Sequence, residues 1–227
     1  MGLIRRLCFQ LFFILFIFSF SGNLYSQESI LSSGSWYKIR IDQNGVYKIS
    51  GSDLSAMGMN ISLIDPANLR IYGNSSGVLP ERNSDTEHIF LQENAIVVED
   101  GGDGSFDGND YILFYGRSPH RWDYVSAFRP FEHIYNVYDD YTYYFITADK
   151  GVGKRIMSIQ ESTQTVTDDV DMFIDHQFHE IDDYNLTSSG RTFYGEVFDL
   201  TTTQQFNFNF PNRMESEEVR LALSVVA

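Results

Sequence analysis

The residues best suited to chemistry are the carboxylates of one short acidic stretch, Glu99 to Asp110, which also contains four glycines. If Glu99 is position 1 of an EF-hand-like loop, Asp103 falls at position 5, Asp107 at 9 and Asp110 at 12. Such positions suit the oxygen ligands of Ca²⁺, and Gly104 at position 6 permits the sharp bend. The spacing therefore indicates a candidate calcium site formed by Glu99, Asp103, Asp107 and Asp110.

The same stretch departs from the calcium-binding pattern in two positions. Position 3 is Gly101, which has no side-chain oxygen, and position 12 is the shorter Asp110 in place of a glutamate. No flanking helices are predicted. The alternative is a solvated Asp/Gly turn in which Asp107 and Asp110 accept hydrogen bonds from backbone amides. We favour the turn and keep calcium as a hypothesis; no other cofactor is expected.

Two further motifs could support chemistry. His176 and His179 are spaced to share a helix face and bind zinc, but no third ligand stands at a recognised spacing, so a structural role is favoured. The run Gly73 to Gly77 matches the G-x-S-x-G pattern of hydrolases. Pro80 argues against the helix that a nucleophile elbow requires, so no function is assigned to Ser75.

The N-terminal residues 1–26 resemble a secretory signal peptide. Arg5 and Arg6 precede an apolar run, Leu7 to Phe20, and cleavage is expected between Ser26 and Gln27. This predicts export through the inner membrane. The apolar run is short for a bilayer span, although an uncleaved signal anchor is the alternative.

Removal of that segment changes the charge and the cysteine content. The rest of the chain has 14 Lys and Arg against 31 Asp and Glu, a net charge of −17, and loses Cys8, the single cysteine. A disulfide framework and a cysteine nucleophile are therefore excluded within residues 27–227. Such an acidic surface repels phosphate backbones, so no nucleic acid partner is expected.

Alternating apolar and polar residues predict a mainly β fold of antiparallel strands and hairpins with one or two short helices. Asn44-Gly45 predicts a tight hairpin between strands at 35–42 and 46–50. Ser52 and Gly58 are expected to cap a short helix. Residues 119–130 look irregular and aromatic. The remaining predicted strands are 69–73, 95–98, 111–116, 141–147 with 154–159 as its hairpin partner, 192–198, 204–210 and 219–225.

The predicted organisation has three parts. Residues 1–26 are the signal peptide, 27–200 form a β-rich accessory domain, and 201–227 begin a second, truncated β-sandwich-like module. The last predicted strand reaches Ala227 without a turn or partner, so we expect a fragment of a longer protein.

Several short motifs resemble, in order, the N-terminal region of the PorU family, the gingipain-like cysteine peptidases that act as sortases of the type IX secretion system in Bacteroidota. Each motif is weak alone, and their order gives the set its specificity. They are Gly34–Ile39, Gly45–Ile49, Ile71–Asn74, Leu79–Glu81, Asp103–Asp107, Asp110–Gly116, Tyr143–Thr147, Asn185-Leu186, Ser189–Arg191 and Phe193–Glu196.

This resemblance implies an outer-membrane, surface-facing protein. The family's enzyme removes the C-terminal signal domain of exported cargo with a Cys–His pair in a downstream caspase-like domain. No catalytic residue carries over to this chain. The resemblance implies three partners: the downstream catalytic domain, a PorV-like outer-membrane barrel, and exported cargo.

Two alternatives remain beside a scaffolding or docking role. One is a stand-alone calcium-dependent surface-binding or adhesion module, for glycans, suggested by the acidic loop and aromatic residues such as Trp122. The other is a domain that covers the active cleft of the peptidase and restrains it.

Overall fold

The computed structural model describes residues 28–74, 77–80, 82, 84, 90–126, 131–186, 188 and 192–226. The predicted signal peptide and Ser75 lie outside these residues. The chain divides into two units, Met1–Gly34 and Ser35–Ala227. In the first, the described part contains one 3₁₀ turn, η1 (Ile30–Ser32). Everything below concerns the second unit.

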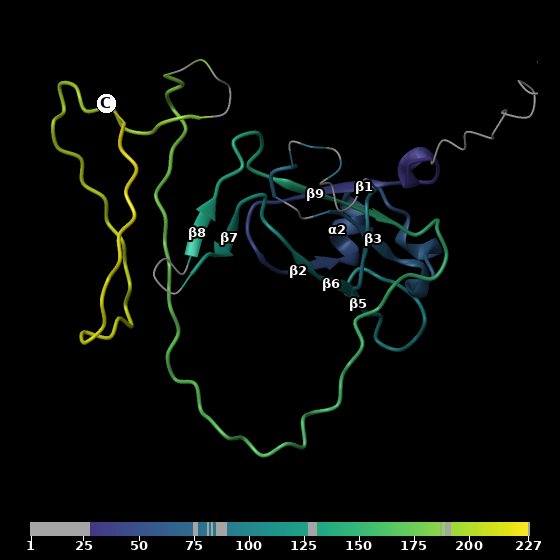
Figure 1. The fold of residues 1–227 in the computed structure, drawn as a ribbon. Helices are drawn as coiled ribbons and strands as arrows, with labels where there is room; N and C mark the ends of the chain where they lie inside the picture. The colour runs from purple at the N-terminus through teal and green to yellow at the C-terminus, as the bar shows by residue number, and fades with distance from the viewer. Residues whose placement is uncertain are drawn as a thin grey trace, which may run out of the picture. The chain divides into compact units, whose positions relative to one another are not determined.

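The second unit is built mainly from short antiparallel strands (Figure 1). Its strands are β1 (Tyr37–Ile41), β2 (Gly45–Ser50), β3 (Arg70–Tyr72), β4 (Glu93–Asn94), β5 (Val97–Glu99), β6 (Tyr111–Gly116), β7 (Arg121–Tyr124), β8 (Phe131–Ile134) and β9 (Thr142–Thr147). Its helical elements are α2 (Gly51–Ala56), η2 (Ile61–Leu63) and η3 (Pro66–Asn68).

These strands form three sheets. The first has the order β1-β9-β3-β4, the second β2-β6-β5, and β7 and β8 form a two-stranded hairpin. Every pairing between these strands is antiparallel. The prediction of a mainly β, antiparallel fold with short helices is confirmed.

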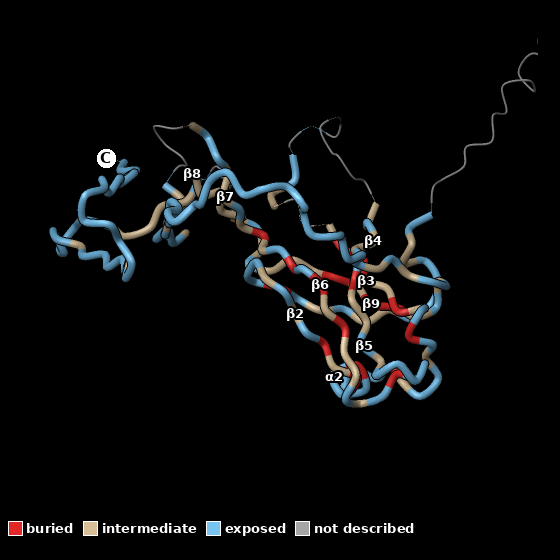
Figure 2. Tube along the Cα trace, turned by 90° about the horizontal axis from the view of Figure 1, so that it is seen from below, coloured by how far each residue is buried: buried red, intermediate tan, exposed pale blue. Residues whose placement is uncertain are grey.

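The first two sheets share one apolar core. Ile71, Tyr144 and Ile146 enter it from the first sheet, and Ile112 and Phe114 from the second. Phe114 and Tyr144 meet edge to face, with ring centroids 5.2 Å apart, a favoured arrangement for aromatic pairs. The buried positions follow these strands and α2 in Figure 2.

The predicted hairpin at Asn44-Gly45 is wrong. β1 pairs with β9 and β2 pairs with β6, so the two consecutive strands belong to different sheets. Gly45 lies in β2 opposite Gly116. Burial alternates along each strand as predicted, but β1 buries Ile41 and β2 buries Ile49 in the shared core. The short connection therefore crosses between sheets.

Two other local predictions, for residues 154–159 and 119–130, are also wrong. Residues 154–159 do not pair with β9, because β1 and β3 already occupy both of its edges. Arg155 instead forms a parallel bridge with Ile96. The segment expected to be irregular, 119–130, contains β7, whose Trp122 lies opposite His133 of β8.

The strands predicted at 192–198, 204–210 and 219–225 are also not formed in the described part of the chain. The described residues between 157 and 226 contain one isolated bridge, Tyr184–Tyr194. Leu221 and Leu223 are 76% and 73% exposed. Alternation marks an apolar face, but a strand also needs a paired neighbour. The domain boundary at 200/201 stays a prediction. No helix among the described residues is long and apolar enough to cross a membrane.

Candidate functional site

The acidic stretch forms the loop between β5 and β6, and its carboxylates accept hydrogen bonds from backbone amides of the same loop. Asp100 Oδ1 accepts a hydrogen bond from Gly102 N at 3.0 Å, and Asp103 Oδ1 accepts one from Ser105 N at 2.8 Å. Gly102 and Gly104 have φ of 80° and 77°, values that favour glycine. These are Asx turns, as the turn interpretation predicts.

The C-terminal half of the loop contains the same kind of hydrogen bond, from a backbone amide to an aspartate carboxylate. Asp110 Oδ2 accepts a hydrogen bond from Asp107 N at 2.7 Å, and Asp107 Oδ1 accepts one from Asn109 N at 2.8 Å. Glu99 lies at the end of β5, opposite Tyr111. The described residues include no group of three or more His, Cys, Asp or Glu that could hold a metal. Calcium binding stays a prediction.

The end of this loop is fastened to the start of α2. Gly51 N donates to Asp110 O at 2.8 Å, and the Ser52 hydroxyl donates to Gly108 O at 2.9 Å. A side chain at Gly51 would overlap the Asp107 carbonyl. The helix is capped by Ser50, whose Oγ accepts from Asp53 N at 3.1 Å. Ser52, the predicted cap, binds the loop instead.

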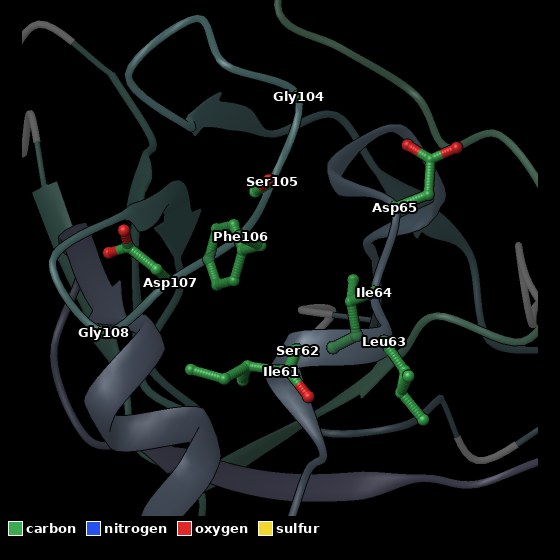
Figure 3. A pocket seen from close by; sticks show the side chains of 10 residues that line it. All are labelled: Ile61, Ser62, Leu63, Ile64, Asp65, Gly104, Ser105, Phe106, Asp107 and Gly108. Carbon is green, nitrogen blue, oxygen red and sulfur yellow. The ribbon is translucent and has the colours of Figure 1, made fainter.

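A hollow of about 530 Å³ lies between this loop and residues 61–65, which comprise η2 and the two residues after it (Figure 3). The side chains of Ile61, Ile64 and Phe106 point into it, and Phe106 is 2% exposed. Asp65 and Asp107 stand on opposite sides. Such a surface can hold an apolar group with polar contacts at the rim. Its polar side chains are the hydroxyls of Ser62 and Ser105 and the carboxylates of Asp65 and Asp107.

The second notable cluster is on the β7–β8 hairpin. The segment His176–Glu180, called here the strap, contacts the hairpin through alternate residues. The His176 ring lies 4.2 Å from Trp122 and 4.5 Å from Phe131, centroid to centroid. His133 Nδ1 lies 3.3 Å from Glu180 Oε2. The strap thus packs in an extended form against an aromatic surface.

The intervening strap residues face another part of the chain. Gln177 Nε2 donates to Asn209 O at 2.6 Å, and its Oε1 accepts from Asn209 N at 3.2 Å. His179 Nε2 lies 2.5 Å from Glu196 Oε1. His176 and His179 therefore have different neighbours, consistent with the structural role favoured for them.

Burial shifts the pKa values of the ionisable groups around the strap. It lowers the pKa of His133 to about 4, and the charges of His120 and His176 act in the same direction. Burial also raises the pKa of the Glu180 and Asp182 carboxyls. The neutral forms of all three groups are thus favoured.

Sequence reasoning missed His133 as part of a site. The available pattern was the alternation of Phe131, His133 and Tyr135, which places three rings on one face of a strand. In the structure His120 stacks on Tyr135 at 4.3 Å and completes the cluster. The strap could not be predicted from this pattern, because its residues lie more than forty positions after His133 in the chain.

No family model and no curated protein matches the chain. Among solved structures, it is similar to dimeric latent PorU from Porphyromonas gingivalis, with 30% sequence identity and a TM-score of 0.44. The match covers 58% of this chain and 11% of that chain.

Proposed function

We propose that this chain is the N-terminal, non-catalytic part of a PorU-like sortase of the type IX secretion system. Its role is to scaffold or dock the cysteine peptidase domain that follows it. The single observation that carries the proposal is the set of ten short motifs in the family's order, from Gly34 to Glu196. The secretory signal peptide predicted for residues 1–26 agrees with a protein exported to the cell surface.

The residues themselves support a non-catalytic role. Cys8, the single cysteine, lies within the predicted signal peptide. His133 and His176 pack among aromatic rings, and His179 pairs with Glu196. A Cys–His peptidase needs a thiolate within reach of an imidazole, and residues 27–227 contain no thiol. In this proposal the peptidase chemistry is assigned to a domain outside these residues.

The proposed partners follow from this placement. The downstream peptidase domain is the first, and an outer-membrane barrel of the PorV type and exported cargo are the others. Exposed apolar surface is one mark of a protein interaction site. The described residues between 156 and 226 supply it, with Met157 84%, Phe173 82% and Leu200 97% exposed.

The test is to read the gene beyond codon 227 and to express the encoded downstream region with this chain. We expect a caspase-like domain with a Cys–His pair, which co-purifies with the chain. A variant with Phe173 and Leu200 changed to Ser should reduce co-purification. The matched control is Val46→Ser on β2, where the valine is 70% exposed, and it should leave co-purification unchanged. A reading frame without a cysteine peptidase domain contradicts the proposal.

A second candidate is a stand-alone calcium-dependent surface-binding module. The observation that favours it is the hollow beside the acidic loop, which joins an apolar floor at Phe106 to Asp65 and Asp107. Calorimetry of the chain with Ca²⁺ tests it, with Asp103 and Asp107 changed to Ala as the comparison. Absence of heat with the unchanged chain rejects this candidate.

A further inference from the structure

β1 is an open sheet edge. It is the terminal strand of the order β1-β9-β3-β4, and in the part of the chain that the structure describes no strand pairs with its other side. The backbone groups of an open edge are a ready template for an incoming strand. An extended peptide that adds to such an edge gains main-chain hydrogen bonds, and its alternate side chains set specificity.

The exposed face of this edge is cationic and held in place by aromatic rings. Lys38 Nζ lies 3.6 Å from the centroid of Tyr143, and Arg40 Cζ lies 4.6 Å from that of Tyr141. Both cations alternate with Ile39 and Ile41, which pack at the core. Ring contacts of this kind orient a cation and leave its positive charge available.

Charge determines which strand this edge can accept. A second copy of β1, paired antiparallel across Ile39, would set Lys38 against Arg40 of the copy, and like charges directly opposite are destabilising. A strand with carboxylates at alternate positions would set one beside each cation. The chain as a whole has a net charge of −15, so two exposed cations on one edge strand are opposite in sign to the net charge of the chain.

We propose that the open edge of β1 docks an extended segment of a partner protein with acidic side chains at alternate positions, by β-strand addition. The carboxylates contact Lys38 and Arg40, and the backbone of the segment pairs with Tyr37–Ile41. This docking surface is independent of the PorU-like assignment: it requires the edge and its charges, whatever domain follows.

β2 provides an internal comparison. It is also a terminal strand, in the order β2-β6-β5, and Lys48 Nζ lies 3.9 Å from the centroid of Tyr111. Two positions before it on the same strand stands Val46 instead of a second cation. Lys48 is therefore a matched control, with the same residue type and the same ring contact but without a charged pair.

The experiment titrates the full chain with a synthetic peptide of alternating glutamate and valine. We expect calorimetry to show binding and hydrogen exchange to slow at the amides of β1. Lys38→Glu with Arg40→Glu should weaken binding at least about tenfold, because like charges then face each other. Lys38→Gln with Arg40→Gln, which removes charge without repulsion, should also weaken binding. Lys48→Glu should change binding less than about twofold.

A second peptide separates strand addition from simple attraction between charges. It has the same sequence with N-methyl groups on alternate residues along one edge, which removes the donors that pair with β1. We expect it not to bind. Equal binding of the methylated peptide, equal binding of a lysine–valine peptide, or unchanged exchange at the β1 amides each overturns the proposal.

Discussion

The imidazole of His133 lies flat against the ring of Phe178, with centroids 3.6 Å apart and planes 17° apart. This contact joins β8 to the strap. The side chain of His133 is 8% exposed, and Glu180 is its polar neighbour from the strap, at 3.3 Å. Because the described structure shows no strand pairing between strap and hairpin, side-chain packing is the main contact between them.

Docking of the strap should weaken as the pH falls. Burial holds the pKa of His133 at about 4, whereas a free imidazole titrates near ~6.5. The released state therefore takes up a proton in this window, and the docked state loses stability as the pH falls from ~6.5 towards 4. Trp122 fluorescence and the imidazole NMR signals of His133 should report the change.

His120, His176 and Glu180 are the ionisable neighbours of His133, and the carboxyls of Glu180 and the nearby Asp182 oppose this effect. Burial raises the pKa of Glu180 and of Asp182. At pH values just above the ordinary pKa of a carboxyl, the docked state therefore binds more protons than the released state. As the pH falls through that range, these two groups stabilise docking. The loss of docking should therefore be clearest at the upper end of the His133 window, near pH ~6.5, furthest from the ordinary carboxyl range. His133→Phe keeps the ring contact and should flatten the profile in this range. An unchanged profile in that variant contradicts the role of His133.

Replacement of Arg155 should destabilise the fold. Its guanidinium donates to the carbonyls of Pro66, Ala67 and Leu69 at 2.8, 2.7 and 3.1 Å, and so fixes η3 and the start of β3. Arg155→Ala should lower the free energy of unfolding by roughly 1–3 kcal/mol, because these bonds have a charged donor. Denaturant unfolding measures this.

Arg155→Lys tests the geometry of that contact. It keeps the charge but cannot reach three carbonyls as a planar fork does, so it should recover less than half of the loss. Arg213→Ala, at an exposed position, should stay within about 0.5 kcal/mol of the unchanged chain. Full recovery of the free energy of unfolding in Arg155→Lys would show that the positive charge alone stabilises this contact, and would contradict the role given to the planar guanidinium.

The sequence predicted strands well where they are buried and poorly where topology decides. β6 and β9 were predicted within a residue of their bounds, because their apolar and aromatic residues match the pleat of a buried strand. Which strand pairs with which is a long-range property. Asn44-Gly45 favours a local hairpin, but burial of Ile41 and Ile49 on two facing sheets overrides it.

The candidate site was predictable only in part. Local Asx turns at Asp103 and Asp107 follow from residue type and spacing, so the turn interpretation of the loop could be made from sequence. The contact between Gly51 and Asp107 could not, because it joins a helix and a loop distant in the chain. The hollow beside Phe106 depends on the same tertiary packing.

Gly73 should not tolerate a side chain. A Cβ at Gly73 would overlap the ring of Tyr144, which is 1% exposed. Gly73→Ala should therefore lower the free energy of unfolding by about 1–3 kcal/mol, the usual cost of overpacking a core. The control is Gly45→Ala, where the nearest atom, on Tyr47, would be 4.0 Å away. Comparable losses in both variants, measured by thermal unfolding, would contradict this reason.

The two interpretations of the acidic loop can be separated by amide substitutions. Asp103→Asn keeps the oxygen that accepts from Ser105 N but removes a negative charge that would strengthen Ca²⁺ binding. If the loop is only a turn, this variant should unfold like the unchanged chain, and Ca²⁺ should stabilise neither. If the loop binds Ca²⁺, millimolar Ca²⁺ should raise the midpoint of the unchanged chain and have less effect on Asp103→Asn. Asp100→Asn, outside the predicted ligand set but in an equivalent turn, should respond like the unchanged chain. A midpoint shift of equal size in all three proteins would place the ion elsewhere and reject the site at Glu99, Asp103, Asp107 and Asp110.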